Sequence, residues 1–213
     1  MTTDSSEPLA DFLLAIVHGD EAIALGLLEK SPALAKAQVK DGATRQDALS
    51  HYFTEMEHYV YAGDSALHVA AAAYRTEVAR RLLAAGADVH AKNRRGAEPL
   101  HYAADGHPDS ANWNPDAQAA IIACLISAGA DPNCVDKSGV GPLHRAVRTR
   151  CAAAVSALID GGADPLLENK SGSTPMLLAT QNTGRGGSGS AEAKRQQEEI
   201  IGLLERHQVR ASG

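Results

Sequence analysis

One short pattern recurs three times in this chain at a fixed spacing. Each copy starts at a glycine (Gly63, Gly96 or Gly139), reaches a Leu-His pair four residues later, and continues through an apolar run to Gly-Ala-Asp. Gly96 follows Gly63 by 33 residues, and Gly172 follows Gly139 by 33 residues. From Gly96 to Gly139 the step is 43 residues, which is one period with an insertion of ten. A period of this length predicts a structural unit that stacks on copies of itself.

Each repeat contains the signals for two short helices and a turn. The first helix follows the Leu-His pair and is rich in alanine, which lets neighbouring helices pack closely. The second helix ends in paired aliphatic residues and stops at Gly86, Gly129 or Gly162, because glycine is favoured in a left-handed helix cap. Residues 93–96, 136–139 and 169–172 are rich in turn formers and predict projecting hairpin loops, here called fingers.

A 33-residue period with a turn, a Leu-His pair and a Gly-Ala-Asp ending resembles the ankyrin repeat. The resemblance implies an all-α solenoid of about five helix-pair units with projecting hairpin fingers and, in this chain, three insertions. It also implies that His68, His101 and His144 brace the fingers through hydrogen bonds. A metal or acid-base role for these histidines is the alternative.

The resemblance implies a single ankyrin-repeat domain over residues 1–213. Both ends read as repeats that have lost the Leu-His pair, and the last helix carries the polar outer face that a terminal unit needs. The predicted parts are an N-terminal cap unit at 9–39, an insertion at 40–62, a second unit at 63–95, a third unit at 96–138 with an insertion at 106–115, a fourth unit at 139–171, and a C-terminal cap unit at 172–207 with an insertion at 181–191.

Composition favours a soluble cytoplasmic chain. The net charge of −6 argues against nonspecific nucleic-acid binding, which needs a basic face. The sequence contains no apolar run long enough to span a membrane, and its three cysteines lack paired spacing. No nucleophile, base and orienting group can be placed together, so we expect no enzymatic activity, and the sequence indicates no cofactor.

The expected function is protein–protein interaction, as a scaffold or adaptor. The groove formed by first helices and fingers is the preferred surface, since tyrosine and arginine are frequent interface hot spots. It is predicted to present Tyr102, Arg145, Arg94, Arg95 and Lys137. The sequence does not identify the protein partner.

A second predicted surface is a notch on the edge opposite the fingers. The insertions at 106–115 and 181–191 separate the two helices of their units and should flank the short loop of the fourth unit. Trp113, Arg148, Arg150 and Arg185, together with a glycine-rich segment that leads into a helix, provide the components of an anion site. The alternative function is therefore a small-molecule or anion-binding protein, or an enzyme, built on this notch. A flexible linker with solvated arginines is the simpler interpretation.

Two residues stand where ankyrin repeats usually have glycine. Tyr74 and Arg150 each lie eight residues before an aliphatic pair, as Gly19 does in the first unit. A left-handed turn there would cost a residue with a side chain about 1 kcal/mol, so a compensating contact is expected.

The first insertion contains His51, Glu55 and His58, at spacings that would place them on one face of a helix. Such a set could hold zinc or iron. The interleaved aromatic residues favour the other interpretation, a segment that packs back on the solenoid, and we expect no metal.

Overall fold

The structure is a computed structural model that describes residues 7–106, 108–109, 113–181 and 190–211. Helices account for most of the described residues. They are α1 (Glu7–His18), α2 (Glu21–Lys30), α3 (Ala66–Ala72), α4 (Thr76–Ala84), α5 (Pro99–Ala103), α6 (Pro115–Ser127), α7 (Pro142–Thr149), α8 (Ala152–Asp160), α9 (Pro175–Thr180) and α10 (Ala191–Ala211). Short 3-10 turns lie at Pro32–Ala35 and Leu49–His51, and a small hairpin is formed by β1 (Tyr52–Phe53) and β2 (His58–Tyr59).

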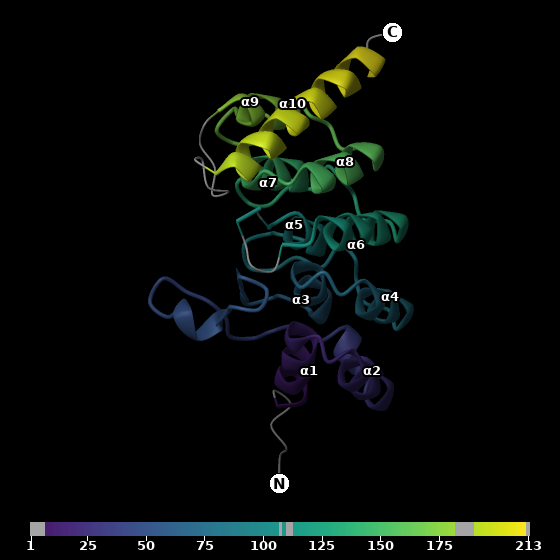
Figure 1. Ribbon diagram of the computed structural model, residues 1–213. Coiled ribbons are helices and arrows are strands. Elements are labelled where there is room, and N and C mark those ends of the chain that lie inside the picture. The colour runs from purple at the N-terminus through teal and green to yellow at the C-terminus, as the bar shows by residue number, and fades with distance from the viewer. Residues whose placement is uncertain (1–6, 107, 110–112, 182–189, 212–213) are drawn as a thin grey trace.

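The helices stack in pairs along one axis, from α1 and α2 at one end to α9 and α10 at the other (Figure 1). The first helices of the pairs contact one another in sequence order, α1 with α3, α3 with α5, α5 with α7 and α7 with α9. The second helices form a parallel layer, in which α6 packs between α4 and α8. The all-α ankyrin-type solenoid expected from the repeat is therefore confirmed. No helix among the described residues is long and apolar enough to cross a membrane.

The core follows the repeat. Leu67, Leu100 and Leu143, which precede the three motif histidines, are buried between successive units. Aliphatic residues near the ends of the second helices are buried in the same way, and alanines fill the narrow space between first helices. Small side chains thus account for how a chain with 4% aromatic residues builds a continuous core.

The local sequence accounts for the helix ends. The Thr174 hydroxyl caps α9 by accepting a hydrogen bond from the Leu177 N–H at 3.1 Å, and Pro175 occupies the first helical position. After α6, Gly129 turns the chain with a φ of 99°, a conformation that favours glycine.

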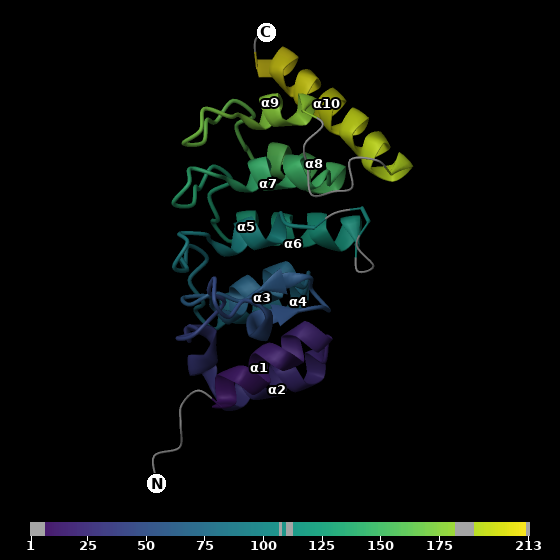
Figure 2. The ribbon, with the colours of Figure 1, turned by 90° about the vertical axis from the view of Figure 1, so that its left-hand side faces the viewer.

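The fingers project from one edge of the stack, whereas α6 and α10 begin at the opposite edge (Figure 2). Neighbouring fingers are joined by backbone hydrogen bonds. The N–H of Arg94 donates to Ala62 at 2.8 Å, that of Lys137 to Arg95 at 3.0 Å, and that of Lys170 to Ser138 at 3.1 Å. The finger tips are therefore held in a regular row.

The first insertion starts and ends at one point of the finger edge. Val39 and Asp64 close its base, because the Val39 N–H donates to the Asp64 carbonyl at 2.8 Å. The β1–β2 hairpin lies within this insertion, with Tyr52 opposite Tyr59. Met56 and Val60 are buried, so the segment packs back on the solenoid on the side of the first helices (Figure 1).

Candidate functional site

Each motif histidine connects its own helix to the finger of the next unit. The Nδ1 atom accepts a hydrogen bond from the backbone N–H of the helix N-cap residue, and Nε2 donates to a carbonyl of the next finger. The partners are Ser65 and Ala97 for His68, Glu98 and Val140 for His101, and Gly141 and Ser173 for His144, at distances of 3.0 to 3.2 Å. The bracing role implied by the family resemblance is confirmed.

These histidines are neutral in the folded protein. Burial lowers the pKa of His68, His101 and His144, and for His101 burial together with the nearby Arg145 guanidinium lowers the pKa to about 3. Since both ring nitrogens of each residue already make hydrogen bonds, neither is available to bind a metal or transfer a proton.

Tyr102 is part of a buried polar cluster. Its side chain is 1% exposed, and its hydroxyl lies 2.8 and 2.9 Å from the two carboxylate oxygens of Asp64. The same carboxylate accepts hydrogen bonds from the Asn93 amide at 2.8 Å and from the Tyr61 N–H at 2.6 Å. Tyr102 therefore stabilises the finger from inside and does not present its hydroxyl on the outer surface of the groove.

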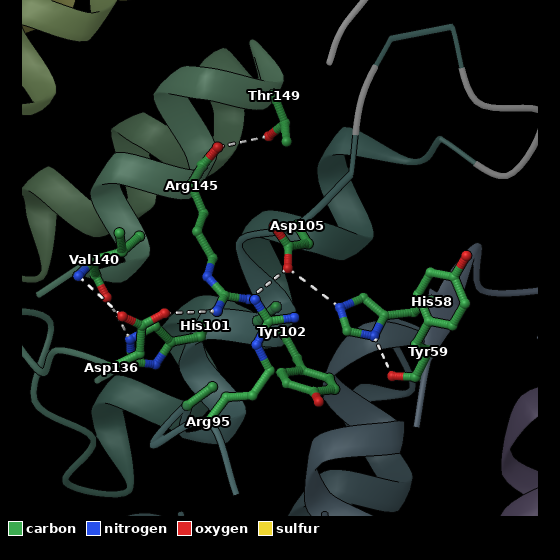
Figure 3. A network of polar contacts seen from close by, with 12 residues as sticks. His58, Tyr59, Arg95, His101, Tyr102, Asp105, Asp136, Val140, Arg145 and Thr149 are labelled. Atoms are coloured by element: carbon green, nitrogen blue, oxygen red, sulfur yellow. Dashed lines mark hydrogen bonds and ion pairs between the residues drawn. The ribbon is translucent and has the colours of Figure 1, made fainter. Parts of the chain in front are cut away.

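Arg145 of α7 joins two carboxylates across neighbouring units (Figure 3). Its guanidinium lies 2.7 Å from Asp105, which follows α5, and 3.3 Å from Asp136 in the next finger. Burial alone would raise the pKa of Asp105, but Arg145 and His58 outweigh this effect and hold the pKa well below its usual range. Arg145 is thus placed in the predicted groove, where its charge is already used within the molecule.

His58 attaches the hairpin to this cluster. Its Nε2 lies 3.2 Å from the Asp105 carboxylate and its Nδ1 lies 2.8 Å from the Tyr59 carbonyl, and its ring packs on Tyr102 with centroids 4.2 Å apart (Figure 3). Both ring nitrogens therefore lie within hydrogen-bond distance of an oxygen atom. The hairpin is therefore fixed to the first-helix surface by the contact with Asp105 and by ring packing on Tyr102.

A cavity of about 400 Å³ lies between the hairpin and the first helices. Its volume falls in the range of small-ligand sites. The wall combines aromatic and charged groups contributed by the hairpin, by a finger and by helix ends. Residues that line it include Glu57, His58, Tyr59, Tyr61, Tyr74, Arg95, Tyr102, Asp105, Trp113, Asn114, Arg145 and Arg148.

A row of exposed basic side chains follows the finger tips beside this cavity. The row, here called the finger row, consists of Arg94, Arg95, Lys137 and Lys170. Arg94 and Arg95 lie over the ring of Tyr61, at 5.3 and 5.0 Å from its centroid, and Arg95 donates to the Tyr61 hydroxyl at 2.9 Å. Arg94 also donates to the Ala43 carbonyl. These contacts fix two of the cations in place and leave them exposed.

The predicted notch is only partly described. Trp113 and the exposed Arg148 line the cavity, whereas Arg150 is buried at the turn between α7 and α8 and lies outside it. Arg185 and the glycine-rich segment fall outside the described residues, as does part of the third-unit insertion. Convergence of the three arginines therefore stays a prediction.

Tyr74 and Arg150 both adopt the left-handed conformation that their positions predict. Their φ angles are 56° and 61°, compared with 79° for Gly19. Tyr74 has the expected compensating contact, because its hydroxyl donates to the Asp105 carbonyl at 2.7 Å. The burial of that hydroxyl raises the pKa of Tyr74 well above its usual range.

The helical interpretation of His51, Glu55 and His58 is wrong. His51 ends a 3-10 turn and His58 lies in β2, on the far strand of the hairpin, because the alternating aromatic residues pair across two strands. Glu55 instead lies 3.6 Å from His18 of α1. Among the described residues, no cluster of histidine, cysteine and acidic side chains has the arrangement of a metal site.

The carboxylates of the site were not predicted. Asn93, Asp136 and Asn169 recur at the first position of each finger and use their side-chain oxygens to accept backbone N–H groups within the finger. This periodicity marks a structural turn residue. The informative departure is the acid at position 136, because the next unit carries an arginine, Arg145, directly after its motif histidine.

Comparison with known proteins agrees with the geometry of helix pairs, histidine-braced fingers and stacked units. A model of ankyrin repeats in three copies matches residues 12–113 and 115–192. The match covers most of the chain, which therefore belongs to the ankyrin repeat family. A search of curated proteins gives no match.

Proposed function

We propose that this chain binds a protein partner through the surface formed by its fingers and first helices. Ankyrin repeats are in general protein–protein interaction modules, and the family is typically a non-enzymatic scaffold. The fold supplies a rigid row of finger tips, since each finger is hydrogen-bonded to the next and braced by a buried histidine. A rigid surface favours binding because little conformational entropy is lost on association.

The finger row is the observation that supports this surface. Its four basic side chains are exposed in a chain whose net charge is −6, so this edge of an acidic molecule presents a row of positive charges. Such a row complements a partner segment rich in Asp and Glu, and complementary charge directs both orientation and association rate. The proposed partner is therefore a protein with an acidic segment that lies across the finger tips.

The cavity beside the row supplies the second element of the proposed interface. Tyr59, Tyr61 and Trp113 give it aromatic walls, and Arg95 belongs both to the finger row and to the cavity lining. A side chain projecting from the acidic segment could enter the cavity while the segment contacts the row. Burial of such an anchor side chain is where interfaces gain most of their affinity.

Removal of the finger-row charges is expected to abolish capture of the partner. The test variant is Arg95→Gln with Lys137→Gln and Lys170→Gln, and the matched control is Arg80→Gln with Arg81→Gln and Lys194→Gln on the second helices. Both sets are exposed, and each removes three positive charges. Wild-type protein and both variants, immobilised at equal density, are used to capture proteins from an extract of the native cell.

The proposal requires a protein that the wild type and the control retain and the finger-row variant loses. Its retention should also weaken as salt rises, since exposed charges are screened over about 8 Å at physiological ionic strength. Equal retention by all three proteins would exclude the finger row as the binding surface, and so would equal loss from both variants.

The volume of the cavity favours a second candidate function, the binding of a small molecule. Its mixed aromatic and charged wall would suit a compact polar ligand that carries both an apolar and an ionised part. Mass spectrometry of the native and the denatured protein distinguishes the two candidates. A stoichiometric compound released on denaturation supports the small molecule, and its absence from protein purified from the native cell argues against it.

A further inference from the structure

Arg150 is a buried cation without a partner in the described structure. Its side chain is 3% exposed at the turn between α7 and α8, and both terminal guanidinium nitrogens are buried with no hydrogen-bond partner among the described residues. A guanidinium removed from water is costly unless a charged or hydrogen-bonding group replaces the lost solvation. An orphaned cation of this kind therefore requires an explanation beyond packing.

The backbone at Arg150 adds to the cost. The residue ends α7 with φ 61° and ψ 48°, which places a long side chain in the left-handed region. Tyr74 occupies the equivalent position two units earlier and has nearly the same φ. The Tyr74 hydroxyl, however, donates to the Asp105 carbonyl at 2.7 Å, and this hydrogen bond offsets the backbone strain at Tyr74. Arg150 has the same backbone strain, but its terminal guanidinium nitrogens make no corresponding hydrogen bond to any residue that the structure describes.

Glu192 of α10, whose helix packs near this turn, is already paired. The Ala152 N–H, at the start of α8, donates to the Gln196 side-chain oxygen at 2.9 Å, which brings α10 against the turn. Glu192, one helical turn before Gln196, accepts from the Gln196 amide at 3.0 Å and lies 2.6 Å from Arg195. These contacts use both carboxylate oxygens of Glu192, and Arg195 lowers the pKa of that group. No contact of Glu192 in the described structure neutralises Arg150.

We propose that Arg150 binds an oxyanion, a free phosphate or carboxylate group, at the turn between α7 and α8. The two unpartnered atoms are the terminal nitrogens of the guanidinium, and this pair matches the two oxygens of a carboxylate or phosphate in a bidentate contact. The turn lies on the edge opposite the fingers (Figure 2), so the site is separate from the finger row. The inference does not depend on the proposed protein partner.

The test is thermal unfolding of the whole chain at constant ionic strength, with sodium phosphate or sodium acetate exchanged against sodium chloride. Phosphate, acetate or both should raise the melting temperature of the wild type, by about 3–5 °C for each tenfold increase above the dissociation constant. Arg150→Gly should lose this saturable rise. Arg150→Lys should retain at most a weak one, because an ammonium cannot make the bidentate contact.

The same variants give a second readout in chloride alone. Arg150→Gly removes an unpaired buried charge and relieves the left-handed backbone, so its melting temperature should equal or exceed that of the wild type. Tyr74→Gly is the matched control, and it should melt lower because it loses a formed hydrogen bond and a buried ring.

Two results would overturn the inference. One is an equal effect of phosphate and acetate on the wild type and Arg150→Gly, including no effect on either. The other is destabilisation of Arg150→Gly in chloride to the same extent as Tyr74→Gly, which would mean that the guanidinium is already satisfied within the protein.

Discussion

Replacement of Arg145 by methionine is expected to lower the free energy of unfolding by about 3–5 kcal/mol, as for other buried ion pairs from which one partner is removed. The Arg145 side chain is 11% exposed, and its guanidinium is shared between Asp105 and Asp136. Methionine preserves much of the side-chain volume, so the lost stability arises mainly from the two carboxylates that no longer have a cationic partner. Urea denaturation of the variant and the wild type measures the difference directly.

Two further variants define the origin of this loss. Arg145→Met combined with Asp105→Asn removes one of the stranded charges and should recover part of the stability. Arg148→Met changes an exposed arginine on the same helix and should cost less than about 1 kcal/mol. If Arg145→Met unfolds within 1 kcal/mol of Arg148→Met, the cluster does not stabilise the fold as the geometry implies.

Acidification from pH 7 to pH 5 is expected to destabilise the protein before most carboxylates titrate. A buried histidine with a lowered pKa excludes a proton that the unfolded chain binds below about pH 6.5, so stability falls as pH drops through the interval between the two values. For His101, with a folded pKa of about 3, this loss amounts to about 2 kcal/mol between pH 7 and pH 5. His68 and His144 add to it in the same direction.

The carboxylate cluster acts in a different pH range. The lowered pKa of Asp105 contributes stability that is complete above the unfolded value of about 3.9 and is lost only at lower pH. The midpoints of urea unfolding at pH 7, 6 and 5 therefore measure the effect of the buried histidines separately from that of Asp105. His101→Gln should be less stable at pH 7 and should show a shallower pH dependence. A wild-type midpoint that stays constant down to pH 5 would contradict neutral, buried histidines.

Features that repeat could be predicted from the sequence. The 33-residue step locates the helix pairs, and the recurrence of one histidine per unit correctly implied bracing of the fingers. The comparison with Gly19 also predicted left-handed conformations at Tyr74 and Arg150, which their φ angles confirm. In each case the same position recurs in several units, so one structural environment explains several residues.

Features that occur once could not be predicted in the same way. The β1–β2 hairpin pairs residues within an insertion that no other unit contains, and its histidines suggested a helix instead. Arg145 contacts Asp105, which lies 40 residues earlier in the sequence. The 33-residue period does not predict this separation, because the insertion of the third unit lies between the two residues. Tyr102 was expected as an exposed contact residue. It is buried because Asp64 of the preceding unit supplies an acceptor, and only the folded stack brings the two together.

The attachment of the β1–β2 hairpin has a consequence for the order in which the helix pairs unfold. In a linear array each unit touches only its neighbours, so units can open one after another from an end. Here His58, which precedes α3, contacts Asp105 after α5, and Asp105 in turn contacts Arg145 on α7. These contacts tie three consecutive helix pairs into one cooperative block. Hydrogen exchange should thus begin at the terminal pairs, α1–α2 and α9–α10, while the middle of the stack opens only as a whole.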